Sequence, residues 1–239
     1  MYEQLIDFHC HILPRIDDGP RNMSQAIRLA QLAQADGIGT VIATPHFYES
    51  KARGLMSRRL DAISSFRSAL AEREILLEVL PGFEVHATHS LLNRRSFGAL
   101  TMAGTHWIML EMPYIYGDEF ETVFDACLEH GLRPLIAHPE RYPYFTTNFT
   151  ALERMVSLGA WAQVTAAAVA GRTNEEEQHW CLRALDMGLA HIVASDMHNT
   201  GKQAPQMQAA IAVLQKQLGD ERTYEIMHLN PARLLGRRL

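Results

Sequence analysis

The stretch LIDFHCHILPRIDDGP, residues 5–20, joins an apolar segment to a dense group of polar side chains. LIDFH at 5–9 predicts a short buried strand, and the loop that follows carries Asp17 and Asp18. Residues i and i+2 of a strand face the same side, so His9 and His11 can share one ion while Cys10 points away. The carboxyl end of this strand is therefore expected to form one corner of a metal site.

Further apolar segments alternate with helical ones along the chain. Strands are expected at 5–9, 40–46, 75–86, 106–113, 133–141, 160–165 and 190–198, and helices at 24–37, 57–73, 118–130, 175–187, 204–218 and 220–236. Seven strands alternating with helices predict a mostly parallel sheet in an α/β fold. Val, Ile and Leu on both faces predict strands that are buried on both sides. An open doubly wound sheet and a closed barrel both satisfy this pattern.

Composition narrows the class of protein. A chain of 239 residues fits one domain spanning 1–239, and 47% hydrophobic with 21% charged residues is ordinary for a globular protein. Acids outnumber bases 27 to 22, so no nucleic-acid surface is expected. Three cysteines imply no disulfide framework and favour a reducing compartment. With no signal peptide and no apolar run of ~18 residues, we expect a cytoplasmic protein without membrane insertion.

Metal-capable side chains follow six of the seven expected strands; only the sixth strand, ending at Thr165, lacks one. In a (β/α) barrel all these strand ends meet at one face, where active sites lie. One such residue alone is usually structural, but the placement of so many metal-capable residues at strand ends is hard to explain by chance. Mixed imidazole and carboxylate ligands suit Mn, Fe or Zn better than Ca or Mg, and their number calls for at least two ions. His86 and His89 follow Glu84 closely and could line the cleft, but they are expected at the surface.

Six segments in series resemble the bacterial protein-tyrosine phosphatases of the PHP superfamily that accompany capsule and exopolysaccharide synthesis: DFHCHILPRIDDGP, IATPHF, LPGFEV, LEMP, IAHPER and VASDMHN. The resemblance runs from about residue 6 to NPARLL near the C-terminus. It implies a distorted (β/α)7 TIM-like barrel, the PHP fold, with a trinuclear centre of divalent metal ions, commonly Mn2+, with Fe or Zn as alternatives. It also implies a tyrosine-phosphorylated protein as substrate, such as a bacterial tyrosine kinase of that pathway.

The resemblance assigns roles to residues motif by motif. The implied metal ligands are His9, His11, Asp18, His46, Glu84, Glu111, His138, Asp196 and His198. Arg141 of IAHPER matches an arginine with which the family binds the phosphoryl group. The chain departs from the family at QVTAAAVAG, residues 163–171. Family members usually carry a small polar residue together with Gly or Ser in that loop, whereas this chain has Ala166, Ala167 and Ala168. This departure affects the expected substrate contacts and leaves the metal ligands intact.

The expected reaction is hydrolysis of a phosphate monoester by a metal-activated water. A rival pattern is CLEHGLR at 127–133, which fits the C-x5-R motif of cysteine-dependent tyrosine phosphatases. Cys127 is expected inside an amphipathic helix instead of a phosphate-binding loop, which argues against that chemistry. Two alternatives stay open: a PHP-type phosphatase for a small molecule such as histidinol phosphate, and a non-catalytic metal-binding regulator.

Overall fold

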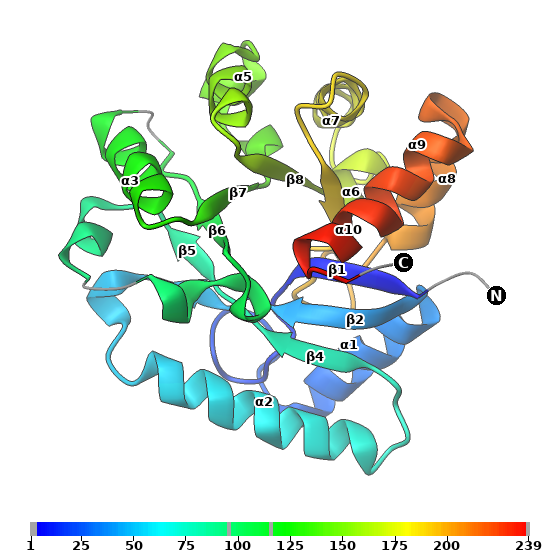
Figure 1. Ribbon diagram of the computed structural model, residues 1–239. Coiled ribbons are helices and arrows are strands. Elements are labelled where there is room, and N and C mark those ends of the chain that lie inside the picture. Colours follow the sequence, from blue (N-terminus) through cyan, green and yellow to red (C-terminus); the bar gives the residue numbers. More distant parts are fainter. Residues whose placement is uncertain (1–3, 95–96, 115–116, 238–239) are drawn as a thin grey trace.

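Two parallel sheets carry all the strands of the computed structural model, which describes residues 4–94, 97–114 and 117–237 (Figure 1). The first sheet has the order β1 (Leu5–Cys10), β2 (Ile38–Ala43), β4 (Glu78–Pro81). The second has the order β3 (His46–Phe47), β5 (Glu84–His86), β6 (Trp107–Glu111), β7 (Arg133–Ala137), β8 (Trp161–Thr165), β9 (Ile192–Ala194). Every pair of neighbouring strands is parallel, as the alternating sequence pattern predicts.

Two of the seven expected strands are each divided into two. The expected strand 40–46 becomes β2 and β3, because Pro45 has no N–H to give to a strand ladder. The expected strand 75–86 becomes β4 and β5 around Gly82, where a Cβ atom would lie 2.6 Å from Ile42 Cγ2. Since β2 leads into β3 and β4 leads into β5, the two sheets are consecutive parts of one curved strand layer.

Hydrogen bonds beyond β9 bring the first and last strands together. Cys10 and Met197 form a parallel bridge, and His11 N donates to the Met197 carbonyl at 2.9 Å. The buried Asp7 carboxylate accepts from Ser195 N at 2.9 Å and from Ser195 Oγ at 2.5 Å. Burial raises the pKa of Asp7 to about 6, although these hydrogen bonds oppose the shift. The strand layer is thus the distorted barrel of the expected (β/α)7 type.

Helices surround this layer (Figure 1): α1 (Met23–Ala35), α2 (Leu55–Ala71), α3 (Asp118–Glu129), α4 (Pro143–Thr146), α5 (Thr150–Ser157), α6 (Ala166–Val169), α7 (Glu175–Asp186), α8 (Met207–Leu218), α9 (Asp220–Tyr224) and α10 (Asn230–Leu234). Short 3-10 turns lie at Glu49–Lys51, His89–Asn93, Gly98–Leu100, Met102–Gly104 and Pro139–Arg141, and a π-helix joins α9 to α10 at Glu225–Leu229. None of the described helices is long and apolar enough to cross a membrane.

Most expected helices are confirmed, with shifted ends. Helix α1 starts at Met23 because Asn22 Oδ1, not Ser24, caps it by accepting from Gln25 N at 3.0 Å. The expected helix 220–236 is α9, the π-helix and α10 in succession. Helix α5 was not predicted.

The barrel interior is apolar up to its polar rim. Trp107 and Met109 of β6 and Leu135 of β7 belong to one buried cluster, together with Leu234 of α10. Trp107, Met109 and Glu111 share one face of β6, because alternate residues of a strand point the same way. The apolar side chains fill the barrel, and the carboxylate at the strand's end is left at the rim. This arrangement places polar side chains at the carboxyl ends of the strands.

Candidate metal centre

All nine side chains that the sequence predicts as metal ligands meet at the carboxyl ends of the strands. They form four overlapping groups, in each of which the possible ligand atoms lie within 4.8 Å of one another. The groups are His11–Asp18–His46–His198, His9–His11–Asp196, His9–Glu84–His138 and His46–Glu84–Glu111. Because neighbouring groups share members, the arrangement suits several adjacent ions better than one.

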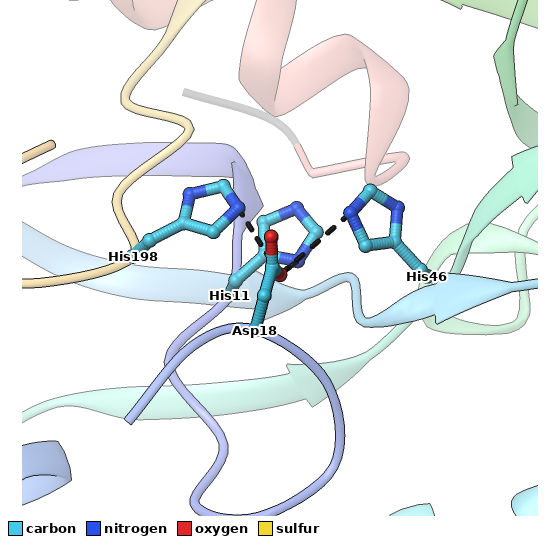
Figure 2. A group of neighbouring side chains, drawn as sticks. All are labelled: His11, Asp18, His46 and His198. Carbon is cyan, nitrogen blue, oxygen red and sulfur yellow. Dashed lines mark ion pairs between the residues drawn. The ribbon is translucent and has the colours of Figure 1, made fainter. Parts of the chain in front are cut away.

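Figure 2 shows the outer group, in which the Asp18 carboxylate lies among the rings of His11, His46 and His198. Asp18 Oδ1 lies 3.4 Å from His198 Nε2, 3.7 Å from His46 Nε2 and 3.8 Å from His11 Nδ1, and its side chain is 63% exposed. The Asp196 carbonyl accepts from His198 Nδ1 at 2.8 Å, which turns the bare Nε2 of that ring toward Asp18. Asp18 therefore closes the site from the loop that follows β1.

Glu84 occupies the centre of the cluster and is almost completely buried. Its Oε1 lies 2.6 Å from His138 Nε2. Its Oε2 lies 2.9 Å from His46 Nδ1, 3.2 Å from His11 Nε2 and 3.4 Å from His9 Nε2. A carboxylate with one oxygen in each of two groups of imidazoles has the geometry of a bridging ligand.

The hydrogen-bond partners of His9 and His11 fix which ring nitrogens carry protons. Gln163 Oε1 lies 2.9 Å from His9 Nδ1, and Asp17 Oδ2 lies 2.7 Å from His11 Nδ1. Both partners are acceptors, so each Nδ1 is protonated and each neutral ring keeps its lone pair on Nε2. The two Nε2 atoms face each other at 3.2 Å. Two lone pairs at this distance repel unless a cation lies between them, so the donor set fits a bound metal ion.

Protons compete with metal ions for the histidine nitrogens of this cluster, because the neighbouring carboxylates stabilise the protonated rings. Burial lowers the pKa of His11, but Asp17 and Glu84 outweigh it and raise that pKa to about 10. Burial likewise lowers the pKa of His46, yet Glu111 and Glu84 raise it to about 12. Burial alone would raise the pKa of Glu84, and the surrounding histidines hold it well below its usual range. Metal binding must therefore displace protons from this cluster.

Arg141 reaches the same face from the 3-10 turn after His138. Its Nη2 donates to Asp196 Oδ2 at 2.6 Å, while Asp196 Oδ1 lies 3.4 Å from His9 Nε2. Burial lowers the pKa of Arg141, but Asp196 outweighs it and raises the pKa. The side chain remains 43% exposed, so part of the guanidinium is open to a ligand. Arg141 forms no ion pair with the neighbouring Glu140 among the described contacts, and Glu140 Oε1 accepts hydrogen bonds from Thr165.

Two members of the site have a strained backbone. His138 has φ of 33° and Asp196 has φ of 52°, in the left-handed region that favours glycine. Non-glycine residues in this region cost about 1–3 kcal/mol each and cluster at functional sites.

The C-x5-R pattern does not form a site. Cys127 is buried within α3, and burial raises the pKa of its thiol to about 12. Arg133 begins β7 and so lies at the opposite end of the barrel, with its guanidinium carbon 6.0 Å from the Trp107 ring centroid. Cys10 is also buried, with Sγ 3.5 Å from the Ile42 carbonyl, as expected for a packing residue.

Three residues at the site escaped the sequence prediction. Gln163 lies on β8, the strand that lacks a metal-capable residue at its end, and Asp17 was left without a role. His86 was expected at the surface, but its Nδ1 lies 3.4 Å from Glu111 Oε2 at the edge of the cluster. A single amide inside the apolar segment AWAQVT was the one available signal for Gln163. Ala166 and Ala168 are buried in α6.

The comparisons with known proteins agree with this geometry. The family model "Capsular polysaccharide synthesis, CpsB/CapC" matches residues 5–236. The tyrosine-protein phosphatase YwqE of Bacillus subtilis (strain 168) is 34% identical over 224 residues, covering 92% of this chain and 87% of its own. The tyrosine-protein phosphatase CpsB of Streptococcus pneumoniae is 25% identical, covering 97% of this chain and 98% of its own.

A solved structure gives the same relation in three dimensions. It comes from the crystal structures of YwqE from Bacillus subtilis and CpsB from Streptococcus pneumoniae, described as unique metal-dependent tyrosine phosphatases. It superposes with a TM-score of 0.91 at 32% sequence identity, over 98% of this chain and 96% of the other. The family match over almost the whole length shows that this chain belongs to the CpsB/CapC family of capsular polysaccharide synthesis proteins.

Proposed function

We propose that this chain is a metal-dependent phosphoric monoester hydrolase that acts on tyrosine-phosphorylated proteins. The observation that carries the proposal is the pair of bare Nε2 atoms of His9 and His11, which face each other beside Glu84 and within reach of the Arg141–Asp196 pair. The names of the relatives, tyrosine-protein phosphatases, support the substrate class.

Nine residues would hold the metal ions: His9, His11, Asp18, His46, Glu84, Glu111, His138, Asp196 and His198. The overlap of the four groups supports three ions, and the mixture of imidazole and carboxylate supports Mn2+, with Fe or Zn as alternatives. When bound, such ions supply Lewis acidity and a water whose pKa is lowered toward neutrality.

Arg141 would bind the phosphoryl group. Asp196 holds one N–H of the guanidinium, and the exposed remainder can donate two parallel hydrogen bonds to phosphoryl oxygens. Gln163 and Asp17 would keep the proton of His9 and His11 on Nδ1, so that Nε2 stays available. Their role is to position the rings, because the oxygen of each accepts a hydrogen bond from a ring Nδ1.

A tyrosine kinase of the capsule or exopolysaccharide pathway is the substrate we propose, with a cytoplasmic location where such a kinase would carry its phosphotyrosines. The family description, capsular polysaccharide synthesis, supports that pathway. The complete ligand set argues against a non-catalytic regulator, and no feature of the described residues favours histidinol phosphate.

The test is a side-by-side rate measurement on a phosphotyrosyl peptide and on histidinol phosphate. Purified protein should hydrolyse the peptide, lose activity with a chelator and regain it with Mn2+. Full activity in a preparation shown by elemental analysis to be metal-free would overturn the metal mechanism. A preference for histidinol phosphate would overturn the proposed substrate.

A further inference from the structure

His86 lies at the end of β5, next to residues that would bind metal ions. Glu84 and His86 are two positions apart on this strand, so their side chains face the same side of it. The parallel register pairs His46 of β3 with Glu84, and it pairs His86 with Glu111 of β6. His86 therefore extends the row of polar side chains along the carboxyl ends of three neighbouring strands.

Four buried side-chain atoms in this row have no hydrogen-bond partner among the described residues: His46 Nδ1, Glu84 Oε2, His86 Nδ1 and Glu111 Oε2. Glu84 Oε2 lies 2.9 Å from His46 Nδ1. Glu111 Oε2 lies 3.5 Å from His46 Nδ1 and 3.4 Å from His86 Nδ1. Buried polar atoms without partners are rare. Two ligand atoms that are each ~2.1 Å from one ion lie ~3.0–3.4 Å apart at octahedral and tetrahedral angles, so this spacing is close to that of metal ligands.

His46 cannot supply a nitrogen ligand to both of the groups in which it takes part. Its Nε2 lies 3.7 Å from Asp18 Oδ1 in the outer group (Figure 2), and its Nδ1 faces Glu84 and Glu111. A neutral imidazole has one nitrogen with a free lone pair, because the other nitrogen carries the proton. If Nε2 binds an ion of the outer group, the ion at Glu84 and Glu111 needs a nitrogen ligand from another residue.

We propose that His86 is a tenth metal ligand, which binds through Nδ1 the ion that Glu84 and Glu111 hold. The proposal rests on the metal-dependent mechanism of the proposed function and assigns one further residue to it. The proton of the neutral His86 ring is then on Nε2. The Tyr48 ring packs beside this imidazole, with the two centroids 5.1 Å apart, and the contact helps to hold the ring in place.

The test measures Mn2+ binding in variants that separate a metal ligand from a hydrogen-bond donor. His86→Phe keeps an aromatic ring beside Tyr48 and has no nitrogen. His86→Asn puts an amide near the position of Nδ1, where it can donate a hydrogen bond to Glu111 but offers a metal ion no charged ligand. His86→Asp puts a carboxylate there, which suits Mn2+ but repels Glu111 when no ion lies between them. The matched control is His89→Phe, which removes an exposed histidine of the following 3-10 turn.

The number of Mn2+ ions bound per chain is measured by equilibrium dialysis and elemental analysis over a series of buffered free Mn2+ concentrations. Loss of a residue that only orients a ligand costs about 10- to 100-fold in metal affinity, so loss of a direct ligand should cost about 100-fold. His86→Phe and His86→Asn should need about 100-fold more Mn2+ to reach the wild-type number of ions. His86→Asp should stay within about tenfold of wild type, and His89→Phe should match it.

Urea unfolding of the metal-free proteins checks the fold of each variant. His86→Asn and His86→Asp are also compared with each other, so a loss of stability that they share does not affect the result. Wild-type Mn2+ binding by His86→Phe overturns the proposal. The reverse order, in which His86→Asn keeps the ions and His86→Asp loses them, also overturns it, because His86 would then only donate a hydrogen bond to Glu111.

These measurements need no substrate, so failure of this proposal is distinguishable from failure of the proposed function. Hydrolysis of a phosphotyrosyl peptide by the wild type, with Mn2+ binding unchanged in all three His86 variants, refutes only the ligand role of His86. Mn2+ binding that depends on His86, in a protein that hydrolyses no phosphotyrosyl peptide, supports the ligand and refutes the activity. A wild-type protein that binds none of Mn2+, Fe2+ and Zn2+ refutes both.

Discussion

Gln163→Leu should weaken metal binding without weakening the fold. Gln163 and His9 are both fully buried, and Gln163 Oε1 is the acceptor for His9 Nδ1 at 2.9 Å. Leucine has a similar volume and cannot accept a hydrogen bond. The substitution therefore tests whether the protein uses Gln163 to hold the His9 proton on Nδ1.

The magnitude follows from where the proton can go. Burial lowers the pKa of His9, but Glu84 and Asp196 outweigh it and raise that pKa, so the measurement is made at a pH high enough for the ring to be neutral. In the metal-free variant the neutral ring can then carry its proton on Nε2, which lies 3.4 Å from both Glu84 Oε2 and Asp196 Oδ1. In the metal-bound variant Nε2 must be bare, so Nδ1–H is buried without an acceptor at a cost of about 1–3 kcal/mol. The cost appears only on binding, so metal affinity should fall about 5- to 150-fold.

The free energy of unfolding should change little in the metal-free protein. Gln163 Nε2 is itself buried without a hydrogen-bond partner among the described residues, so leucine removes an unsatisfied donor as well as an acceptor. We expect a change within about 1 kcal/mol, because a buried pair exchanged for an apolar group of the same shape is nearly neutral. Gln163→Glu is the control, since it keeps an oxygen at the same position.

The assay is competition with a chromophoric chelator for Mn2+, together with urea unfolding of the metal-free proteins. Gln163→Leu should lose metal to the chelator at concentrations where wild type and Gln163→Glu keep it. Wild-type affinity in Gln163→Leu would refute the reasoning. So would a loss of stability in the metal-free variant large enough to explain weaker binding by unfolding.

The remaining predictions concern the centre, its protons and the rival cysteine. Arg141→Ala should lower kcat/KM on a phosphotyrosyl peptide, with a loss of transition-state stabilisation of about 2–4 kcal/mol and unchanged metal content. Arg141→Lys should recover little of this loss, because lysine offers a single mobile charge. Near-wild-type kinetics of both variants would make the residue structural. Glu84→Gln should lower turnover and metal content together while the far-UV circular dichroism stays native, and normal metal stoichiometry would show that Glu84 is no ligand. Apparent Mn2+ affinity should rise with pH from about 6.5 to about 10. The reason is that Asp17 and Glu84 outweigh burial and raise the pKa of His11 to about 10, so the protonated ring that competes with the metal disappears only as pH passes that value. Calorimetry in two buffers should show proton release on binding, and pH-independent binding would contradict the prediction. Cys127→Ser should keep turnover within about twofold while costing about 1–3 kcal/mol of stability, since it buries a hydroxyl in an apolar contact; a thousandfold loss would restore the cysteine mechanism.

The alternating pattern of the sequence predicted a parallel α/β fold with metal-capable residues at the strand ends, and the family resemblance then selected the barrel and the set of nine ligands. The reason is geometric: in a parallel α/β barrel the carboxyl end of every strand faces the same side, whatever the detailed packing. A residue's place at the end of an apolar segment therefore determines its place in space. His9, Glu84, His138 and Asp196 are far apart in the chain, and the structure brings them into contact.

Only the tertiary structure decided how these side chains are held. Gln163 is 154 residues from His9, and their hydrogen bond depends on the register of β8 against the barrel interior, which no local pattern encodes. The division of two strands depends on a proline and on the close approach of Gly82 to Ile42. Glu140 is likewise fixed by hydrogen bonds from Thr165, which join the turn after β7 to the end of β8. Periodicity specifies which face of an element is buried, whereas hydrogen bonds between distant elements require the packed fold.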